Sequence, residues 1–106
     1  MSRRWTCGRC AVIVSYGPEA DVPTRPDGWV RDNGAWRCLR CRREDAMDEA
    51  SSASTAEGRA DRRRALLAFE IRRDPAAPDR VIAKRARCPT AAVRGVRTAL
   101  SKEQDG

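Results

Sequence analysis

Hydrophobic residues occur in short β-rich runs in the first half of the chain and with helical spacing in the second half. In the first half, AVIVS (Ala11 to Ser15) is rich in β-branched residues and predicts one arm of a β-hairpin. The stretch GWVRDNGAWRC predicts two further short strands around Asp32-Asn33-Gly34, because Asn-Gly favours a tight turn. The segment RREDAMDEA (42–50) contains helix-forming residues and no helix breaker, so a short helix is expected there.

In the second half the apolar positions repeat with the period of an amphipathic helix. Ile82 and Ala86 lie four residues apart. Val93 and Val96 lie three apart, and Leu100 continues the same stripe. We predict three helices here, at about residues 61–73, 79–87 and 90–102.

Local signals support the ends of these helices and the division of the chain. Asp74-Pro75 should end the first helix, and Pro89 disfavours continuation of the second, with Thr90 a suitable N-cap for the third. SSASTAEG (51–58) is small, polar and flexible, which is typical of a linker. The predicted organisation is a first module at 1–50, a linker at 51–60 and a helical domain at 61–106.

Charge changes this picture because the two halves differ. The chain has 106 residues, and its 22 basic and 15 acidic residues give a formal net charge of +7. Residues 1–50 contain nine Arg and eight acidic residues, whereas residues 51–106 contain thirteen basic and seven acidic residues. The positive field therefore belongs to the second half, where it serves either an anionic partner or a solvated basic surface.

The hydrophobic runs are too short for membrane insertion. None approaches the roughly 18 apolar residues of a membrane span, and no apolar core follows the two N-terminal arginines as it would in a signal peptide. We expect a cytoplasmic protein without a membrane partner. In a reducing compartment, paired cysteines are more often metal ligands than disulfides.

The pattern W-x-C-x-x-C occurs twice, as WTCGRC (Trp5 to Cys10) and WRCLRC (Trp36 to Cys41). Its two Cys-x-x-Cys pairs supply four thiolates, which suit one tetrahedral zinc ion that would stabilise a module too small to hold itself together. The predicted ligands are Cys7, Cys10, Cys38 and Cys41. The two tryptophans should shield the sulfurs and form much of the small core. The alternative is a pair of redox dithiols or disulfides.

Two Cys-x-x-Cys pairs separated by hairpin sequence resemble the zinc-ribbon and treble-clef families. In CLRCRREDAMDEA a helix begins at the second pair, which is more similar to a treble clef. Neither pair carries the Pro or following Gly frequent in ribbon knuckles. The expected fold is an α+β zinc module, with a β-hairpin and a short helix, followed by an all-α domain of three helices.

The segment DRVIAKRARCPTAAVRGVRTAL resembles the helix-turn-helix of bacterial and phage regulators. In that resemblance Ile82 and Ala83 lie at the helix crossing, and Val93 and Val96 form the buried face of the recognition helix. Arg87 stands where the turn normally has Gly, so the turn must accommodate a residue with a side chain.

The opposite face of the last predicted helix carries the candidate DNA contacts. Arg94 is three residues from Arg97 and four from Thr98, so these side chains should project together and read base edges. Thr90, Ala91 and Ala92 would bring the helix N-terminus close to the groove. Basic residues of the preceding helix and turn should bind phosphates: Lys84, Arg85 and Arg87. The alternative is a three-helix bundle for protein contact.

Catalysis is not expected. The chain has no His and no Gly-rich phosphate loop, and a four-cysteine site leaves no open position on a metal. The fifth cysteine, Cys88, fits the apolar turn position of the helix-turn-helix better than a ligand role.

These patterns together predict a zinc-stabilised, sequence-specific transcriptional regulator that binds double-stranded DNA, of the kind found in bacteria and phages. Because one helix-turn-helix usually needs a second copy for affinity, a homodimer is compatible with this function. The alternative is a protein-interaction adaptor that docks, for example, on RNA polymerase through the zinc module and binds nucleic acid non-specifically.

Overall fold

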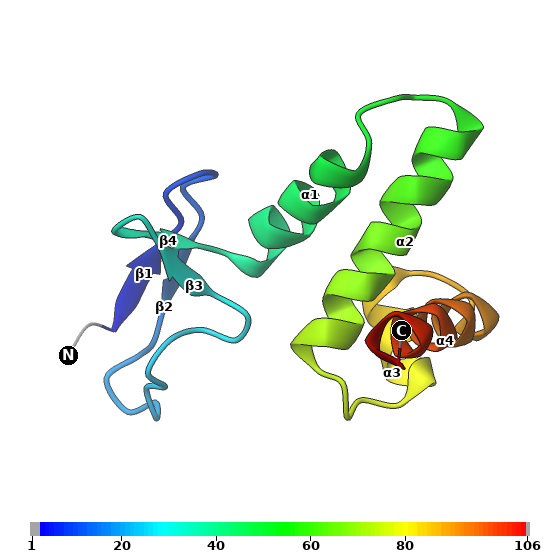
Figure 1. The fold of residues 1–106 in the computed structure, drawn as a ribbon. Helices are drawn as coiled ribbons and strands as arrows, with labels where there is room; N and C mark the ends of the chain where they lie inside the picture. The colour runs from blue at the N-terminus through cyan, green and yellow to red at the C-terminus, as the bar shows by residue number, and fades with distance from the viewer. Residues whose placement is uncertain (1–2, 106) are drawn as a thin grey trace. The chain divides into compact units, whose positions relative to one another are not determined.

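The computed structural model describes residues 3–105, which form two small antiparallel β-hairpins followed by four helices (Figure 1). The strands are β1 (Arg4–Thr6), β2 (Ile13–Ser15), β3 (Val30–Asp32) and β4 (Ala35–Arg37). The helices are α1 (Leu39–Ala50), α2 (Ala56–Arg73), α3 (Asp79–Ala86) and α4 (Thr90–Asp105). The chain divides into two compact units, residues 1–44 and residues 45–106, so the division falls inside α1. No helix within residues 3–105 is both long enough and apolar enough to cross a membrane.

Both predicted hairpin regions form hairpins in the first unit. β2, the strand within AVIVS, pairs with β1 so that Val14 lies opposite Trp5. β3 and β4 are joined by Asn33 and Gly34, whose φ values of 50° and 81° give the left-handed backbone of a two-residue hairpin turn. A parallel bridge between Cys7 and Trp36 connects one hairpin to the other.

The core of the first unit is made of aromatic rings and cysteines. Trp5 and Trp29 are each 5% exposed, and Trp36 packs partly buried against the same cluster. The ring of Tyr16 stands nearly perpendicular to that of Trp5, with the centroids 5.6 Å apart. The sequence analysis assigned Trp5 and Trp36 to this core but did not identify Trp29, which precedes β3 and carries no cysteine pattern.

In the second unit, α2, α3 and α4 pack around one hydrophobic core (Figure 1). Ile82 of α3 and Val93 of α4 are fully buried, as the apolar stripe predicted. Val96 and Leu100 pack partly buried against them. Leu67 and Ile71 of α2 complete this core.

The start of α2 differs from the prediction. The helix begins at Ala56 instead of about residue 61, so only residues 51–55 of the predicted linker at 51–60 lie outside helices. The reason is an N-cap: the Thr55 hydroxyl accepts a hydrogen bond from the Gly58 N–H at 3.0 Å. Gly58 is itself buried, and a Cβ there would overlap the carbonyl oxygen of Ala53.

A buried charge in α2 was also not foreseen. Glu70 is completely buried, and its carboxylate accepts hydrogen bonds from Arg73 at 2.8 and 3.2 Å. The Arg73 side chain is 13% exposed, so the two charges leave water together. Removing either partner would break a buried ion pair, which is usually strongly destabilising.

Candidate metal centre and candidate nucleic-acid interface

Four cysteine sulfurs converge in the first unit. The Sγ atoms of Cys7, Cys10, Cys38 and Cys41 all lie within 4.8 Å of one another. Cys7 and Cys41 are 3.8 Å apart, and Cys10 and Cys38 are 3.6 Å apart. This group could hold a metal ion, and it contains the four residues predicted from the two Cys-x-x-Cys pairs.

The first pair is held by a tight turn after β1. The Ala11 N–H donates to the Cys7 carbonyl at 3.0 Å, and the Cys7 N–H donates to the Val12 carbonyl at 2.9 Å. Ala11 adopts a φ of 64°, in the left-handed region where glycine is usual. The turn therefore brings Cys10 back beside Cys7 without the glycine that such turns commonly use.

The second pair is positioned by the start of α1. Cys38 immediately precedes the helix, and Cys41 lies in its first turn. The Arg42 N–H donates to the Cys38 carbonyl at 3.0 Å, which continues the helical hydrogen-bond pattern back to Cys38. One pair thus comes from a strand-end turn and the other from a helix start.

The environment of the sulfurs favours a thiolate at Cys7. Burial raises the pKa of its thiol. Hydrogen bonds from the backbone N–H groups of Cys10, Cys38 and Arg9 lower the pKa by more than burial raises it, so the pKa of Cys7 falls to about 6. Two of these N–H groups, from Arg9 and Cys38, lie 3.4 Å from the Cys7 sulfur. Burial and neighbouring thiols raise the pKa of Cys38 to about 12. A bound cation would stabilise the other cysteines as thiolates, so metal binding should release the protons of their thiols.

An ion pair ties the first turn to α1. Arg9 donates to Glu44 at 2.7 Å, and Arg40 donates to the same carboxylate at 3.3 Å. The hydrogen bond from Arg9 lowers the pKa of the Glu44 carboxyl. Both Arg9 and Glu44 are partly exposed, so this contact orients the turn more than it stabilises it.

In the second unit, α3 and α4 are joined by three residues with a defined turn. Arg87 has φ 55° and ψ 45°, so a residue with a side chain occupies the left-handed conformation in which glycine is usual. The N–H of Cys88 donates to the Ala83 carbonyl at 3.0 Å, and that of Arg87 donates to Lys84 at 3.4 Å. This is the Schellman arrangement of a helix C-terminus.

Several predicted contact residues lie on one exposed face of α4. Ala91, Arg94 and Thr98 are all exposed, and their spacing places them on the same side of the helix. Thr98 donates its hydroxyl back to the Arg94 carbonyl at 2.9 Å. Thr90 was predicted to be the N-cap, the residue before the helix. In the structure Thr90 is the first residue of α4.

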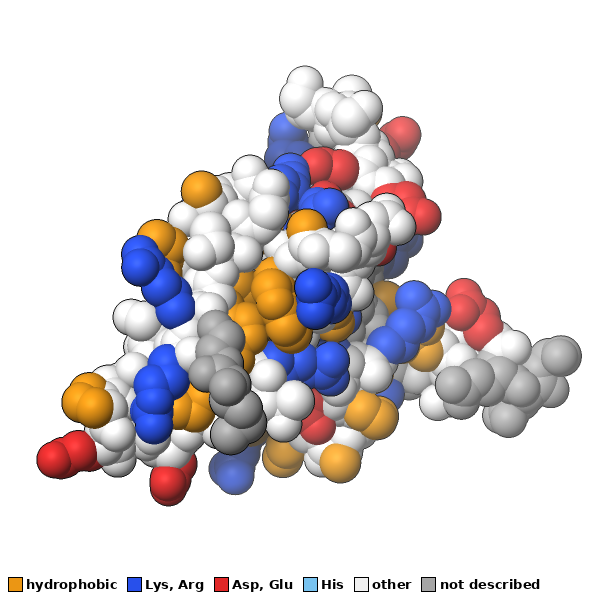
Figure 2. All heavy atoms as spheres, turned by 90° about the vertical axis from the view of Figure 1, so that its left-hand side faces the viewer, with side chains coloured by type: hydrophobic (Ala, Val, Ile, Leu, Met, Phe, Trp, Pro, Cys, Tyr) orange, Lys and Arg blue, Asp and Glu red, His pale blue; other side chains and the backbone are white. Residues whose placement is uncertain are grey.

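The basic residues of α3 and its turn differ in their partners. Lys84 and Arg87 are exposed and, among residues 3–105, make no side-chain ion pair or hydrogen bond. Arg85 pairs with Asp74 at 3.1 Å. Figure 2 shows Lys and Arg side chains spread among hydrophobic ones on one face of the molecule, so overall positive charge alone does not locate a binding surface.

Arg97 and Ala92 do not join the exposed face. Arg97 donates to Asp79 at 2.8 Å, to the Ala77 carbonyl at 2.9 Å and to the Pro75 carbonyl at 3.1 Å. This side chain therefore braces the connection between α2 and α3. Ala92 is half-buried and packs against the core. Helical spacing predicted Arg97 on the Arg94 face because spacing does not show which polar side chain has a partner inside the fold. Ala92 was predicted to let the helix N-terminus approach the groove, but it packs inward instead.

Comparison with protein families, characterised proteins and solved structures gave no match to this chain.

Proposed function

We propose that this protein is a sequence-specific DNA-binding regulator whose second unit binds double-stranded DNA as a helix-turn-helix. The observation that carries this proposal is the α3–α4 pair. Two helices are joined through a left-handed residue, Arg87, and α4 presents an exposed face whose arginine, Arg94, has no side-chain partner among the described residues. A short helix, a fixed turn and a second helix with a free polar face suit insertion of α4 into a major groove.

The residues on this surface would divide into two roles. Arg94 would read a base edge, since its guanidinium can bind O6 and N7 of guanine. Lys84 and Arg87 would bind phosphates, because their uncompensated charges lie on the helix and turn that precede α4. Arg97 would act indirectly, by holding the α2–α3 connection against α4.

We further propose that the four cysteines hold one structural zinc ion. Zinc binds thiolates tetrahedrally with bonds of about 2.3 Å, which places the sulfurs about 3.8 Å apart. Two of the sulfur–sulfur distances, 3.6 and 3.8 Å, fit this geometry, and all four sulfurs lie within 4.8 Å of one another. With four protein ligands the ion has no site for substrate water, so its role would be to stabilise the small first unit. Cysteine ligands from a turn and from a helix start are similar to those of a treble clef.

Selection of binding sites from random duplex DNA, followed by titration of variants, tests the DNA proposal. Arg94→Ala should cost about 1–3 kcal/mol on the selected site and relax the choice of base at one position. Lys84→Ala should weaken all duplexes equally and lower the slope of log affinity against log salt by about one. Equal, uniform losses for both variants would exclude base reading by α4, and no loss in either would exclude DNA binding by this surface.

Metal analysis under reducing conditions tests the zinc proposal. We expect about one zinc per chain. Cys7→Ser should unfold the first unit and leave the helical circular dichroism of the second largely intact. A first unit that stays folded in excess chelator would contradict a structural metal.

A second candidate function, a protein-interaction adaptor, is favoured by one observation. Val12 and Ile13 are 45% and 48% exposed, and they are large hydrophobic side chains beside the first cysteine pair. Such residues would suit contact with a protein, for example RNA polymerase. The adaptor predicts that polymerase binds wild type but not a Val12→Ser, Ile13→Ser double variant, and that no duplex sequence is preferred.

A further inference from the structure

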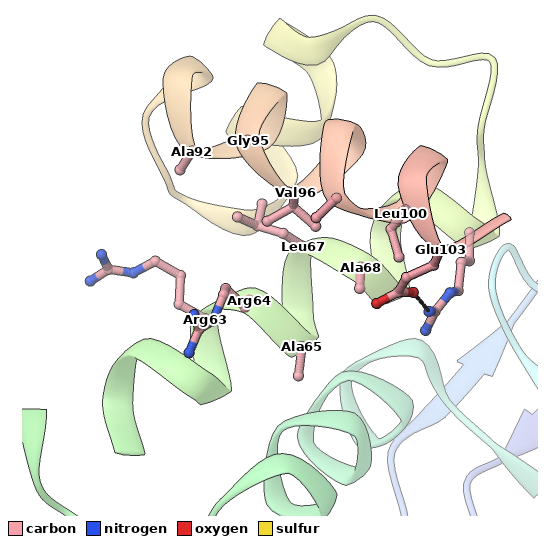
Figure 3. Close-up of a pocket in the computed structure, with 12 residues that line it drawn as sticks. Arg63, Arg64, Ala65, Leu67, Ala68, Ala92, Gly95, Val96, Leu100 and Glu103 are labelled. Atoms are coloured by element: carbon pink, nitrogen blue, oxygen red, sulfur yellow. Dashed lines mark ion pairs between the residues drawn. The ribbon is translucent and has the colours of Figure 1, made fainter. Parts of the chain in front are cut away.

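A groove of about 490 Å³ lies between α2 and α4 in the helical unit (Figure 3). The larger apolar residues of its lining are Leu67, Val96 and Leu100. On α4 the lining also includes the small residues Ala92, Gly95 and Ala99. A Cβ at Gly95 would meet no atom within 4 Å, so the helix backbone is open to close approach there. The groove is therefore an apolar surface that another helix could reach.

The groove lies on a different side of α4 from the face that carries Arg94. At 100° per residue, Ala99 projects about 140° away from Arg94 around the helix axis. Thr98, the neighbour of Ala99, projects with Arg94 instead. Occupation of the groove would therefore leave the exposed polar face of α4 free.

The two ends of the groove differ in charge. Arg63 and Arg64 lie at one end, and Glu103 lies at the other (Figure 3). Arg64 pairs with Asp61, and Glu103 lies beside Arg72. Arg63 is exposed and has no ion-pair partner among the described residues. Glu103 is 3.9 Å from Arg72, and both side chains are about two-thirds exposed, at 70% and 66%. This long pair leaves the carboxylate open to a second cation.

We propose that this groove is the surface through which two copies of the chain associate about a two-fold axis, with α4 of each copy against α2 and α4 of the other. A two-fold axis across the groove places the Arg63 end of one copy at the Glu103 end of the other. Arg63 would then meet Glu103 of the second copy, and the contact would occur twice. This reciprocal pairing of Arg63 with Glu103 is the reason that a second copy fits the groove.

Packing supports the same occupant. Gly95 and Ala99 are four residues apart and have at most a methyl side chain, so two α4 helices could approach closely there. Val96 and Leu100, which are only partly buried, and the exposed Ala99 supply the apolar area that association would remove from water. The dimer would carry two copies of the Arg94 face, although the association itself does not depend on DNA binding.

Sedimentation equilibrium of the full, zinc-loaded chain without DNA tests this proposal. Over roughly 1–300 µM, where modest interfaces associate, wild type should show a monomer–dimer equilibrium. Ala99→Glu should raise the dissociation constant at least about tenfold, because it places a charge in the apolar contact. Thr98→Glu is the matched control, with the same added charge on the neighbouring residue, and should leave dimerisation unchanged.

A charge exchange tests the two-fold arrangement itself. Arg63→Glu and Glu103→Arg should each weaken the dimer several-fold, and the double variant should restore it, because the pairs are re-formed between copies. Helical circular dichroism equal to wild type would show that each variant is folded. A chain that stays monomeric throughout, a dimer weakened equally by Ala99→Glu and Thr98→Glu, or no rescue in the double variant would overturn the proposal. Because the experiment contains no DNA, its failure would be distinct from failure of the proposed regulator function.

Discussion

Replacing Arg97 by methionine should destabilise the helical unit by about 2 kcal/mol while leaving the exposed face of α4 unchanged. Methionine keeps an unbranched side chain of similar reach but donates no hydrogen bond. The substitution removes donors to Asp79, to the Ala77 carbonyl and to the Pro75 carbonyl. Pro75 and Ala77 lie between α2 and α3, and Asp79 is the first residue of α3, so the loss should destabilise the whole helical unit.

The magnitude follows from the contacts. A neutral hydrogen bond contributes about 1 kcal/mol net, and one from a charged group about 1.5–3 kcal/mol. The Arg97 and Asp79 side chains are 30% and 26% exposed, so water replaces part of each lost contact. The sum is therefore reduced to about 2 kcal/mol for all three contacts. For a unit of this size, that loss lowers Tm by roughly 8–16 °C.

Thermal unfolding followed by circular dichroism at constant zinc measures this loss. Arg94→Met is the matched control on the same helix, since Arg94 makes no side-chain contact among the described residues. It should change the free energy of unfolding by less than about 0.5 kcal/mol but weaken DNA binding. Arg97→Met should bind DNA with unchanged sequence preference well below its Tm. Normal stability of Arg97→Met together with an altered base preference would refute the bracing role.

Three further predictions concern single positions. Arg87→Gly should stabilise the helical unit by about 0.5–1 kcal/mol in thermal unfolding, because glycine removes the left-handed strain, while weakening all duplexes equally in titrations; lower stability would contradict the turn geometry. Gly58→Ala should destabilise the helical unit by about 1–3 kcal/mol in the same unfolding assay, although alanine has the better helix propensity, because its Cβ would overlap the Ala53 carbonyl oxygen. Gly17→Ala is the control and should be nearly neutral, because a Cβ at that position meets no atom within 4 Å. Cys88→Ala should retain stoichiometric zinc by metal analysis, because this cysteine is outside the four-cysteine group; zinc loss with the fold preserved would make it a ligand.

In the second unit, helical periodicity predicted the helices and core positions but not every helix boundary. Spacing predicted three helices and identified Ile82, Val93 and Val96 as core positions, because a buried stripe needs only local sequence to be recognised. It did not predict the early start of α2. There the capping hydroxyl of Thr55 lies in a polar stretch whose composition resembles a linker, and only the structure shows which hydroxyl has an N–H to accept.

The four-cysteine group was predictable from the sequence because its members follow from residue type and spacing. Two Cys-x-x-Cys pairs specify four sulfurs whatever fold connects them, and the two hairpins then bring Cys7 and Cys41 to 3.8 Å. Trp29 lacked such a pattern. Its burial depends on the path of the long loop between the hairpins, which local sequence does not determine.

The partners of charged side chains could not be predicted from the sequence alone. Helical spacing put Arg94 and Arg97 on one face, yet Arg94 is free among the described residues and Arg97 has three partners from a segment about twenty residues earlier. Glu70 likewise reads as an exposed helical residue in the sequence but is completely buried beside Arg73. The sequence by itself determined the four-cysteine group, the Asn-Gly turn and the apolar stripes, because these follow from residue type and short-range spacing. Only the tertiary structure decided which charges are paired and which remain free, because the partners of a charged side chain come from segments that folding, not the neighbouring sequence, brings within hydrogen-bond distance.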